Sequence, residues 1–399
     1  MSGLQCGDRA GRGGGWSGVR CAVGGVVGVA WLLLASGAAA QPAPGVPTGA
    51  TPEACIAGSD AACVDLGWRL LTGKGVKQDI GEGERLVGLS CGRGGGTACK
   101  LMGAWKASAP LNPKPDLAAA EGFAEKACKL GDHEGCMVLG MVRVQRGRFK
   151  EGLDALLVGC AYKLPEACYQ AGLLYSRGTA AGIPQDARRA LPLLEKACRA
   201  GHGHACHEVG IIWREGRIGV DLEKSAAYYI KACDLGSAHA CGDAGNRLAE
   251  GRGVAKDVAR GIELMTRGCD DGAPYACWLL ARYYTTGIGV KPDVDTTLKL
   301  LATACDGGVG LACKDLSQAM LIPGMAATFP DPDADRKILA LAQVHLTQEC
   351  HEGHEGRSCK WLGLLKQKGR LPSAGPQEVK RLFKIACTYD LRMCEPGAQ

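Results

Sequence analysis

The feature that most constrains this chain is a recurring pair of cysteines. KACDLGSAHAC (231–241) holds two cysteines eight residues apart with a glycine between them. Close variants stand at 126–136, 196–206, 267–277 and 303–313. Such a pair is compatible with a metal site, a reactive thiol or a disulfide, and each alternative implies a different kind of function.

The pairs recur with a period close to 36 residues. Apart from Cys6 and Cys21, the cysteines form ten pairs, eight of them eight residues apart, one nine and one seven. The first members of successive pairs lie 32 to 45 residues apart, most of them 35 to 38. This period is the size of one helix-turn-helix unit, so the sequence predicts a repeat array.

Geometry limits how a pair can bond locally. On one helix, residues eight apart are separated by about 12 Å, whereas a disulfide needs Cα atoms within roughly 6.8 Å. If the two cysteines bond to each other, the chain must therefore reverse between them. Glycine, which tolerates the left-handed conformation of such a turn, stands three residues after the first cysteine at Gly131, Gly201, Gly236, Gly272 and Gly308.

The N-terminus predicts export. Scattered arginines precede an apolar run that ends in the small residues Ala38–Ala40, which is typical of a secretory signal peptide. We expect residues 1–40 to be this signal and 41–54 to be a flexible, Pro-rich lead-in. Cleavage of the signal at residues 1–40 removes Cys6 and Cys21. The mature chain then has an even number of cysteines, which favours an oxidised framework of disulfides. The mature chain is then expected in the periplasm or outside the cell, with no membrane span.

The repeat unit resembles a known family. AC-x3-G-x2-Y-x2-G-x-G-V-x2-D followed by KAC-x2-G is similar to the Sel1-like repeat, a relative of the tetratricopeptide repeat. The residues that carry it include CVDLGWRLLTGKGVKQD (63–79), 241–261 and 277–293, and the resemblance covers 55–394. With the export signal, the cysteines resemble the cysteine-rich (Hcp) branch of secreted bacterial proteins, some of whose members are named β-lactamases.

The resemblance implies an all-α fold. It is an α/α solenoid of about nine to ten helix-turn-helix repeats over residues 55–394, wound as a right-handed superhelix with a concave surface and followed by a tail at 395–399. In such a solenoid each of the ten cysteine pairs is a disulfide between neighbouring helices: Cys55–Cys63, Cys91–Cys99, Cys128–Cys136, Cys160–Cys168, Cys198–Cys206, Cys233–Cys241, Cys269–Cys277, Cys305–Cys313, Cys350–Cys359 and Cys387–Cys394. We expect irregular repeats at 104–122 and 320–336, and Pro165 in place of the usual turn glycine.

Two functions follow from this pattern. A stacked solenoid presents an extended surface, so the first hypothesis is an exported scaffold that binds a peptide, a protein or a cell-wall fragment on its concave surface. The alternative, by resemblance only, is a weak β-lactam binder or β-lactamase-type hydrolase. The sequence contains neither S-x-x-K nor K-T-G, the motifs of serine β-lactamases. We therefore identify no catalytic residues.

The sequence also predicts no cofactor and no nucleic-acid partner. The nearest approach to a metal site is HGHACH, which contains His202, His204 and His207. These histidines occupy an interhelical turn, and Cys206 is expected in a disulfide, so we expect no metal there. The net charge is +6 with acids and bases interspersed, which is not the pattern of a nucleic-acid-binding stripe. The aromatic residues are interpreted as packing residues: Trp213, Tyr228, Tyr229, Tyr283 and Tyr284.

Overall fold

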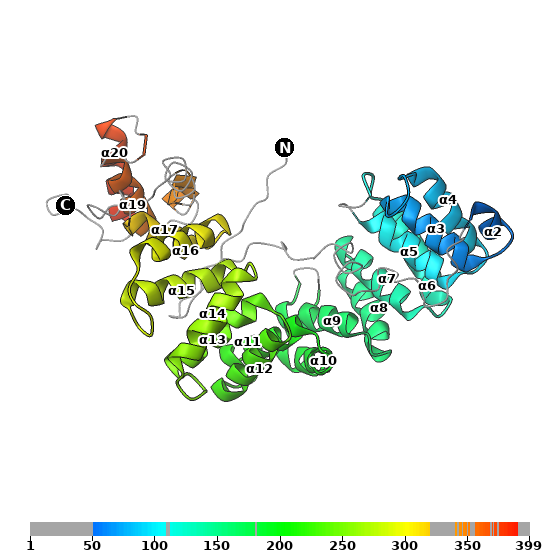
Figure 1. The fold of residues 1–399 in the computed structure, drawn as a ribbon, viewed down its shortest axis with the longest axis horizontal. Helices are drawn as coiled ribbons and strands as arrows, with labels where there is room; N and C mark the ends of the chain where they lie inside the picture. Colours follow the sequence, from blue (N-terminus) through cyan, green and yellow to red (C-terminus); the bar gives the residue numbers. More distant parts are fainter. Residues whose placement is uncertain are drawn as a thin grey trace. The chain divides into compact units, whose positions relative to one another are not determined.

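The computed structural model describes residues 51–108, 112–179 and 182–319, and residues 340–389 with short gaps. In these parts of the chain the regular secondary structure is helical (Figure 1), apart from two isolated β-bridges. The chain divides into two compact units, Met1–Leu193 and Leu194–Gln399. The predicted α/α solenoid of helix-turn-helix repeats, stapled by C-x7-C disulfides, is confirmed.

The helices alternate between two kinds, which we call A and B. An A helix begins beside the second cysteine of a pair, and a B helix ends beside the first cysteine of the next pair. The A helices are α3 (Asp60–Thr72), α5 (Gly96–Ala107), α7 (His133–Gln145), α9 (Pro165–Arg177), α11 (Gly203–Glu215), α13 (Ala238–Glu250), α15 (Pro274–Thr286), α17 (Gly310–Ala319) and α19 (Gly356–Gln367). The B helices are α4 (Ile80–Gly92), α6 (Leu117–Lys129), α8 (Phe149–Ala161), α10 (Ala187–Arg199), α12 (Leu222–Asp234), α14 (Val258–Asp270), α16 (Val294–Asp306) and α20 (Pro376–Tyr389). A short helix, α2 (Pro52–Ile56), carries Cys55, and none of the described helices is long and apolar enough to cross a membrane.

The G-x-G-V-x2-D motif ends one helix and begins the next. Gly73 closes α3 in the left-handed conformation (φ 72°), which glycine adopts without a Cβ clash. Asp79 then caps α4, because its carboxylate accepts the backbone N–H of Glu82 at 3.0 Å. Gly251 and Asp257 serve the same purposes for α13 and α14. The motif therefore fixes where each helix pair turns.

Small residues allow the two helices of a repeat to pack closely. A Cβ at Gly245 of α13 would lie 2.5 Å from the carbonyl oxygen of Gly261 in α14, and a Cβ at Gly261 would lie 2.7 Å from the carbonyl oxygen of Gly245. Both distances are shorter than a van der Waals contact. A side chain at either position would therefore force α13 and α14 apart.

The disulfides of the described residues close the turns that lead into the A helices. Cys233 lies in the last turn of α12 and Cys241 in the first turn of α13, with Cα atoms 4.5 Å apart. Between them Gly236 is left-handed (φ 84°), and Ser237 donates its N–H to the carbonyl of Ala232 at 3.0 Å, as in a Schellman motif. The other disulfides of the described residues are Cys55–Cys63, Cys91–Cys99, Cys128–Cys136, Cys160–Cys168, Cys198–Cys206, Cys269–Cys277, Cys305–Cys313 and Cys350–Cys359.

The expectation about Pro165 was wrong. Pro165 is the first residue of α9, where its fixed φ and missing N–H are tolerated. The position that other repeats fill with glycine is occupied by Lys163, which has φ 64°. It is the one non-glycine residue with positive φ among the described residues. The turn geometry is therefore kept without the residue type that favours it.

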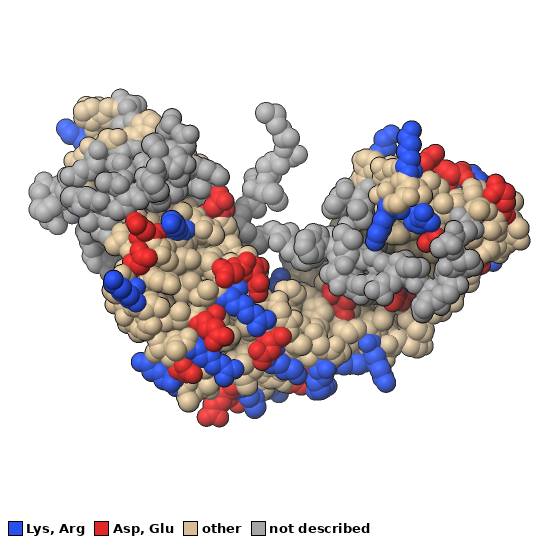
Figure 2. Space-filling view, viewed as in Figure 1, with Lys and Arg blue, Asp and Glu red and all other residues tan. Residues whose placement is uncertain are grey.

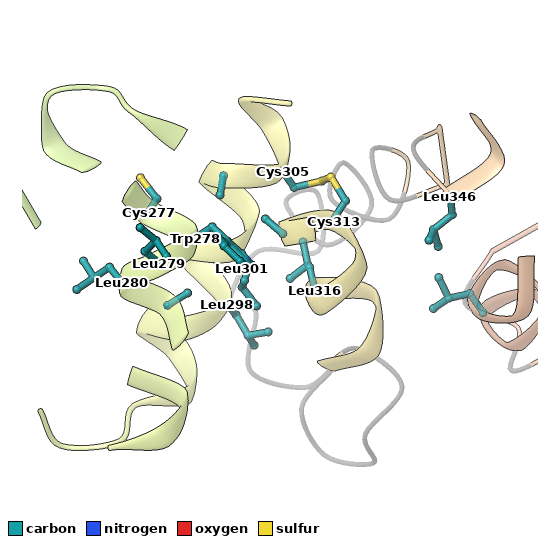
Figure 3. Close-up of a cluster of buried hydrophobic side chains, with 14 of the residues drawn as sticks. Cys277, Trp278, Leu279, Leu280, Leu298, Leu301, Cys305, Cys313, Leu316 and Leu346 are labelled. Atoms are coloured by element: carbon teal, nitrogen blue, oxygen red, sulfur yellow. A yellow bond between two sulfur atoms is a disulfide. The ribbon is translucent and has the colours of Figure 1, made fainter. Parts of the chain in front are cut away.

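The cores are thin layers of Leu, Ala and disulfide sulfur. In the second unit, Trp278 and Leu279 of α15 pack with Leu298 and Leu301 of α16 (Figure 3), and Leu316 of α17 joins the same cluster. The disulfide Cys305–Cys313 forms part of this layer. This staple thus contributes buried apolar volume as well as a crosslink.

Two predicted boundaries need correction. Helix α2 starts at Pro52, so the end of the expected lead-in 41–54 is helical. The irregular stretch expected at 104–122 is shorter, because α5 continues to Ala107 and α6 begins at Leu117. Other predictions lie outside the described residues, namely those for 1–40, 320–336, 395–399 and Cys394.

Candidate binding face of the A helices

Successive A helices touch one another in each unit. In the first unit α5 contacts both α3 and α7, and in the second unit α13 contacts both α11 and α15. Within each unit these A helices therefore form a layer, α3–α5–α7 in the first and α11–α13–α15 in the second, while each B helix packs mainly against the A helices next to it in sequence. We call the surface shared by α11, α13 and α15 the inner face of the second unit.

Polar side chains from neighbouring repeats meet on this face. His207 of α11 contacts Asp243 of α13, with Nε2 and Oδ2 2.8 Å apart. Arg214, two turns further along α11, lies 3.7 Å from the other carboxylate oxygen of Asp243. His207 and Asp243 are mostly buried, with 17% and 19% of their side chains exposed. One carboxylate thus links two repeats through two partners.

Tyr229 lies beneath these groups. It comes from α12, is fully buried, and its ring packs 5.4 Å from that of His207. Its hydroxyl makes no hydrogen bond of normal geometry among the described residues. The Ser225 hydroxyl, which interacts with the phenol, donates its own hydrogen to the carbonyl of Gly210. Burial raises the pKa of Tyr229 well above its usual value, and the charge of Asp243 adds to this rise. The phenol therefore stays protonated, and its O–H can donate a hydrogen bond.

Arg247 completes what we call the Asp243 cluster: His207, Arg214, Tyr229, Asp243 and Arg247. The Arg247 guanidinium stands 5.9 Å from the centre of the Tyr229 ring, and only 8% of the residue is exposed. His239 lies nearby, where partial desolvation lowers its pKa and the neighbouring His207 adds to the effect. The cluster thus combines charge, hydrogen-bonding groups and an aromatic ring in a partly dehydrated place.

Aromatic residues extend the face onto α15. Tyr275 is 38% exposed and its ring lies 5.3 Å from that of Trp278. The Arg282 guanidinium sits over the Trp278 ring at 5.4 Å, a cation–π contact. Trp278 is held in place by a hydrogen bond from Nε1 to Asp315 of α17 at 2.8 Å. Tyr275 and Arg282 are therefore exposed side chains on a fixed support.

Charge is mixed on the side of the second unit that Figure 2 shows. Figure 2 shows Lys and Arg intermingled with Asp and Glu over this part of the molecule, without a broad field of one sign. Such a surface selects partners by local pairing rather than by long-range attraction.

The three candidate metal ligands of HGHACH do not converge, although the ring centres of His202 and His204 lie 6.0 Å apart. His202 caps α11, its Nδ1 accepting the N–H of Ala205 at 3.1 Å. His204 reaches the Ser237 hydroxyl at 3.4 Å, and His207 is engaged by Asp243. Among the described residues no group of three or more His, Cys, Asp or Glu side chains is placed to hold a metal ion.

The aromatic residues differ in what they do. Tyr229 and Tyr283 are buried, and Tyr284 packs against the core. Trp213 stacks with the Lys224 ammonium at 4.3 Å, and the Tyr228 hydroxyl donates to Glu195 at 3.0 Å. Packing therefore describes most of these residues. For Tyr229 the packing interpretation is incomplete, because this residue also belongs to the polar cluster.

Sequence reasoning missed the Asp243 cluster, although a signal was present. An acidic residue stands two positions after the second cysteine in four repeats, at Asp65, Glu208, Asp243 and Asp315. On an A helix this position faces the neighbouring A helix, as the contacts of Asp243 and Asp315 show. A recurring acid beside a structural cysteine therefore marks the inner face.

The fold and its motif define a class of helical repeat protein. The Sel1 repeat model matches residues 60–91, 110–132, 165–202, 203–237, 238–272 and 274–309. The chain therefore belongs to the Sel1-repeat family.

Solved structures of similar fold agree with this assignment. A Sel1 repeat protein from Oxalobacter formigenes is 22% identical with a TM-score of 0.59, covering 81% of this chain and 92% of that one. The protective antigen c5321 of uropathogenic Escherichia coli is 18% identical with a TM-score of 0.58, covering 84% and 78%. At these identities the likeness concerns the fold alone.

A curated relative matches a shorter stretch. Cytochrome c oxidase assembly factor 7 of Xenopus tropicalis is 29% identical over 152 residues, which is 35% of this chain. The match spans 65% of the length of that relative.

Proposed function

We propose that this Sel1-repeat protein is an exported scaffold that binds a peptide or protein segment on the inner face of its second unit. The observation that carries the proposal is the concentration of Tyr275, Arg282 and the Asp243 cluster on adjoining A helices. Tyr, Trp and Arg dominate the binding energy of protein interfaces, above all where they are partly dehydrated.

The repeat architecture favours an extended ligand. Neighbouring A helices present equivalent positions one after another, so a segment that contacts α11 can continue across α13 and α15. The disulfide at each B-to-A turn holds these helices in place before binding, which lowers the ordering cost of association.

Two further observations support an exported scaffold. Disulfides persist in oxidising compartments, and nine are present among the described residues. This agrees with export by the signal expected at residues 1–40. The frog relative is named for the assembly of another protein complex, which is consistent with a chain that acts by holding proteins.

Photo-crosslinking tests the proposal. A benzophenone amino acid would replace Tyr275 on the inner face in one variant and Glu263, an exposed residue of the B helix α14, in a matched control. After irradiation in cells of the source organism, we expect a discrete protein adduct from position 275 and none from position 263. Equal adducts from both positions, or adducts with glycan only, would contradict a peptide-binding inner face.

A further inference from the structure

Arg247 is a nearly buried cation without an anion. It occupies the sixth position after Cys241 in α13, where α11 has Ile212 and α15 has Tyr283. Burying an unpaired charge is costly unless a partner compensates for it. Yet within the described residues the Arg247 guanidinium has no carboxylate at ion-pair distance, and its contact is the Tyr229 ring at 5.9 Å.

The acidic side chains of the cluster and of the ends of α11 and α13 already have basic partners. Asp243 is shared between His207 and Arg214. Glu215 pairs with Arg214 and Arg217, and Glu250 pairs with Arg252 at 2.7 Å. Asp243, the one acidic side chain of the cluster, therefore has two basic partners of its own, and Arg247 is not one of them.

A second donor lies beside this guanidinium. The Tyr229 hydroxyl is buried and makes no hydrogen bond of normal geometry among the described residues, although it interacts with Ser225. Arg214 interacts with both Tyr229 and Asp243, and its side chain is 36% exposed.

We propose that Arg247 and Tyr229 bind a carboxylate of the partner segment. This inference rests on the proposed function and names the group that the inner face recognises. A carboxylate offers two acceptor oxygens, one for the guanidinium and one for the phenol, and charge-assisted hydrogen bonds of this kind are strong when partly dehydrated. The carboxylate comes from an Asp or Glu side chain or from the C-terminus of the segment.

Two variants separate this role from a structural one. Arg247→Met keeps most of the side-chain volume and removes the charge, so the fold is expected to stay intact. Tyr229→Phe removes a hydroxyl that makes no hydrogen bond of normal geometry among the described residues, so thermal stability is expected to stay the same or rise. Arg260→Met is the matched control, because Arg260 is exposed on the B helix α14.

Three peptide libraries serve as probes on the disulfide-intact chain 41–399. All are random octamers: one has a fixed central Glu and a blocked C-terminus, one a central Gln and a free C-terminus, and one a central Gln and a blocked C-terminus. We expect wild type and Arg260→Met to retain at least one carboxylate library more strongly than the blocked Gln library. We expect Arg247→Met to lose that preference by about tenfold or more, and Tyr229→Phe to lose part of it.

The outcomes distinguish the proposals. Preference for the central Glu library assigns the site to acidic side chains, and preference for the free C-terminus assigns it to chain ends. Equal retention of all three libraries, or a preference that survives in Arg247→Met, overturns the carboxylate site and leaves inner-face binding standing. Retention of no library overturns both the site and the binding of short segments.

Discussion

Replacing Lys163 by glycine is expected to stabilise the protein. Lys163 is exposed and holds φ 64° at the turn between α8 and α9, a position that glycine fills in most of the other repeats. A left-handed conformation costs a non-glycine residue about 1–2 kcal/mol. Glycine removes that cost but gives the unfolded chain more freedom, worth about 0.4–1 kcal/mol. The net gain in the free energy of unfolding is the difference, about 0.8 kcal/mol at the middle of these ranges and at most about 1.6 kcal/mol.

The reverse change at an equivalent turn provides the matched test. Gly236 has φ 84°, and a Cβ added to it would meet no other atom within 4 Å, so Gly236→Lys changes backbone preference without creating a clash. We expect it to lose about the amount that Lys163→Gly gains, again about 0.8 kcal/mol. Lys163→Ala keeps the Cβ and should have little effect.

The assay is urea unfolding of the disulfide-intact protein, monitored by circular dichroism. The midpoints are compared at the same dependence of the unfolding free energy on urea concentration. Because stability in a repeat array is partly local, amide exchange in α8 and α9 would locate the change. If Lys163→Gly leaves the midpoint unchanged or lowers it, or if Lys163→Ala stabilises equally, the backbone explanation is refuted.

The remaining predictions concern the staples and one buried acid. Changing Cys233 and Cys241 together to Ser opens a loop of about nine residues, and the chain-entropy model gives such a crosslink about 2.6 kcal/mol of stability. Amide hydrogen exchange in α12 and α13 should rise first. Unchanged exchange there would refute a stabilising role of this disulfide. Burial opposes ionisation of Glu121, but the hydrogen bond from Arg143 and the nearby arginine charges outweigh it and lower its pKa. A lowered pKa means stability that is present above the ordinary value of 4.5 and lost as pH falls through the folded value. Glu121→Gln should therefore lower the free energy of unfolding by roughly 2–4 kcal/mol at neutral pH and flatten the acid limb of a plot of stability against pH. An unchanged plot would contradict a stabilising role of the ionised Glu121 side chain.

Much of the fold could be predicted from the sequence because the repeat encodes it locally. The cysteine period indicates the unit length, and the turn glycines and capping aspartates indicate the helix ends, as Gly73 and Asp79 illustrate. Lys163 shows where this fails, since tertiary packing and the adjacent disulfide impose a turn that the residue itself disfavours.

The candidate site could not be predicted in the same way. His207 and Asp243 are 36 residues apart, and only the stacking of α11 on α13 brings them together. Arg247 resembles an ordinary exposed charge in the sequence, because its burial depends on Tyr229 from a different helix. Such contacts depend on how adjacent repeats stack on each other. The sequence pattern within one repeat does not specify this stacking.

Hydrogen–deuterium exchange of the chain with its crosslinked partner segment tests the central claim most directly. The account predicts new protection of exchangeable amides in α11, α13 and α15, with little change in the B helices α12, α14 and α16. Protection confined to the B helices, or no protection in the second unit, would contradict binding on the inner face.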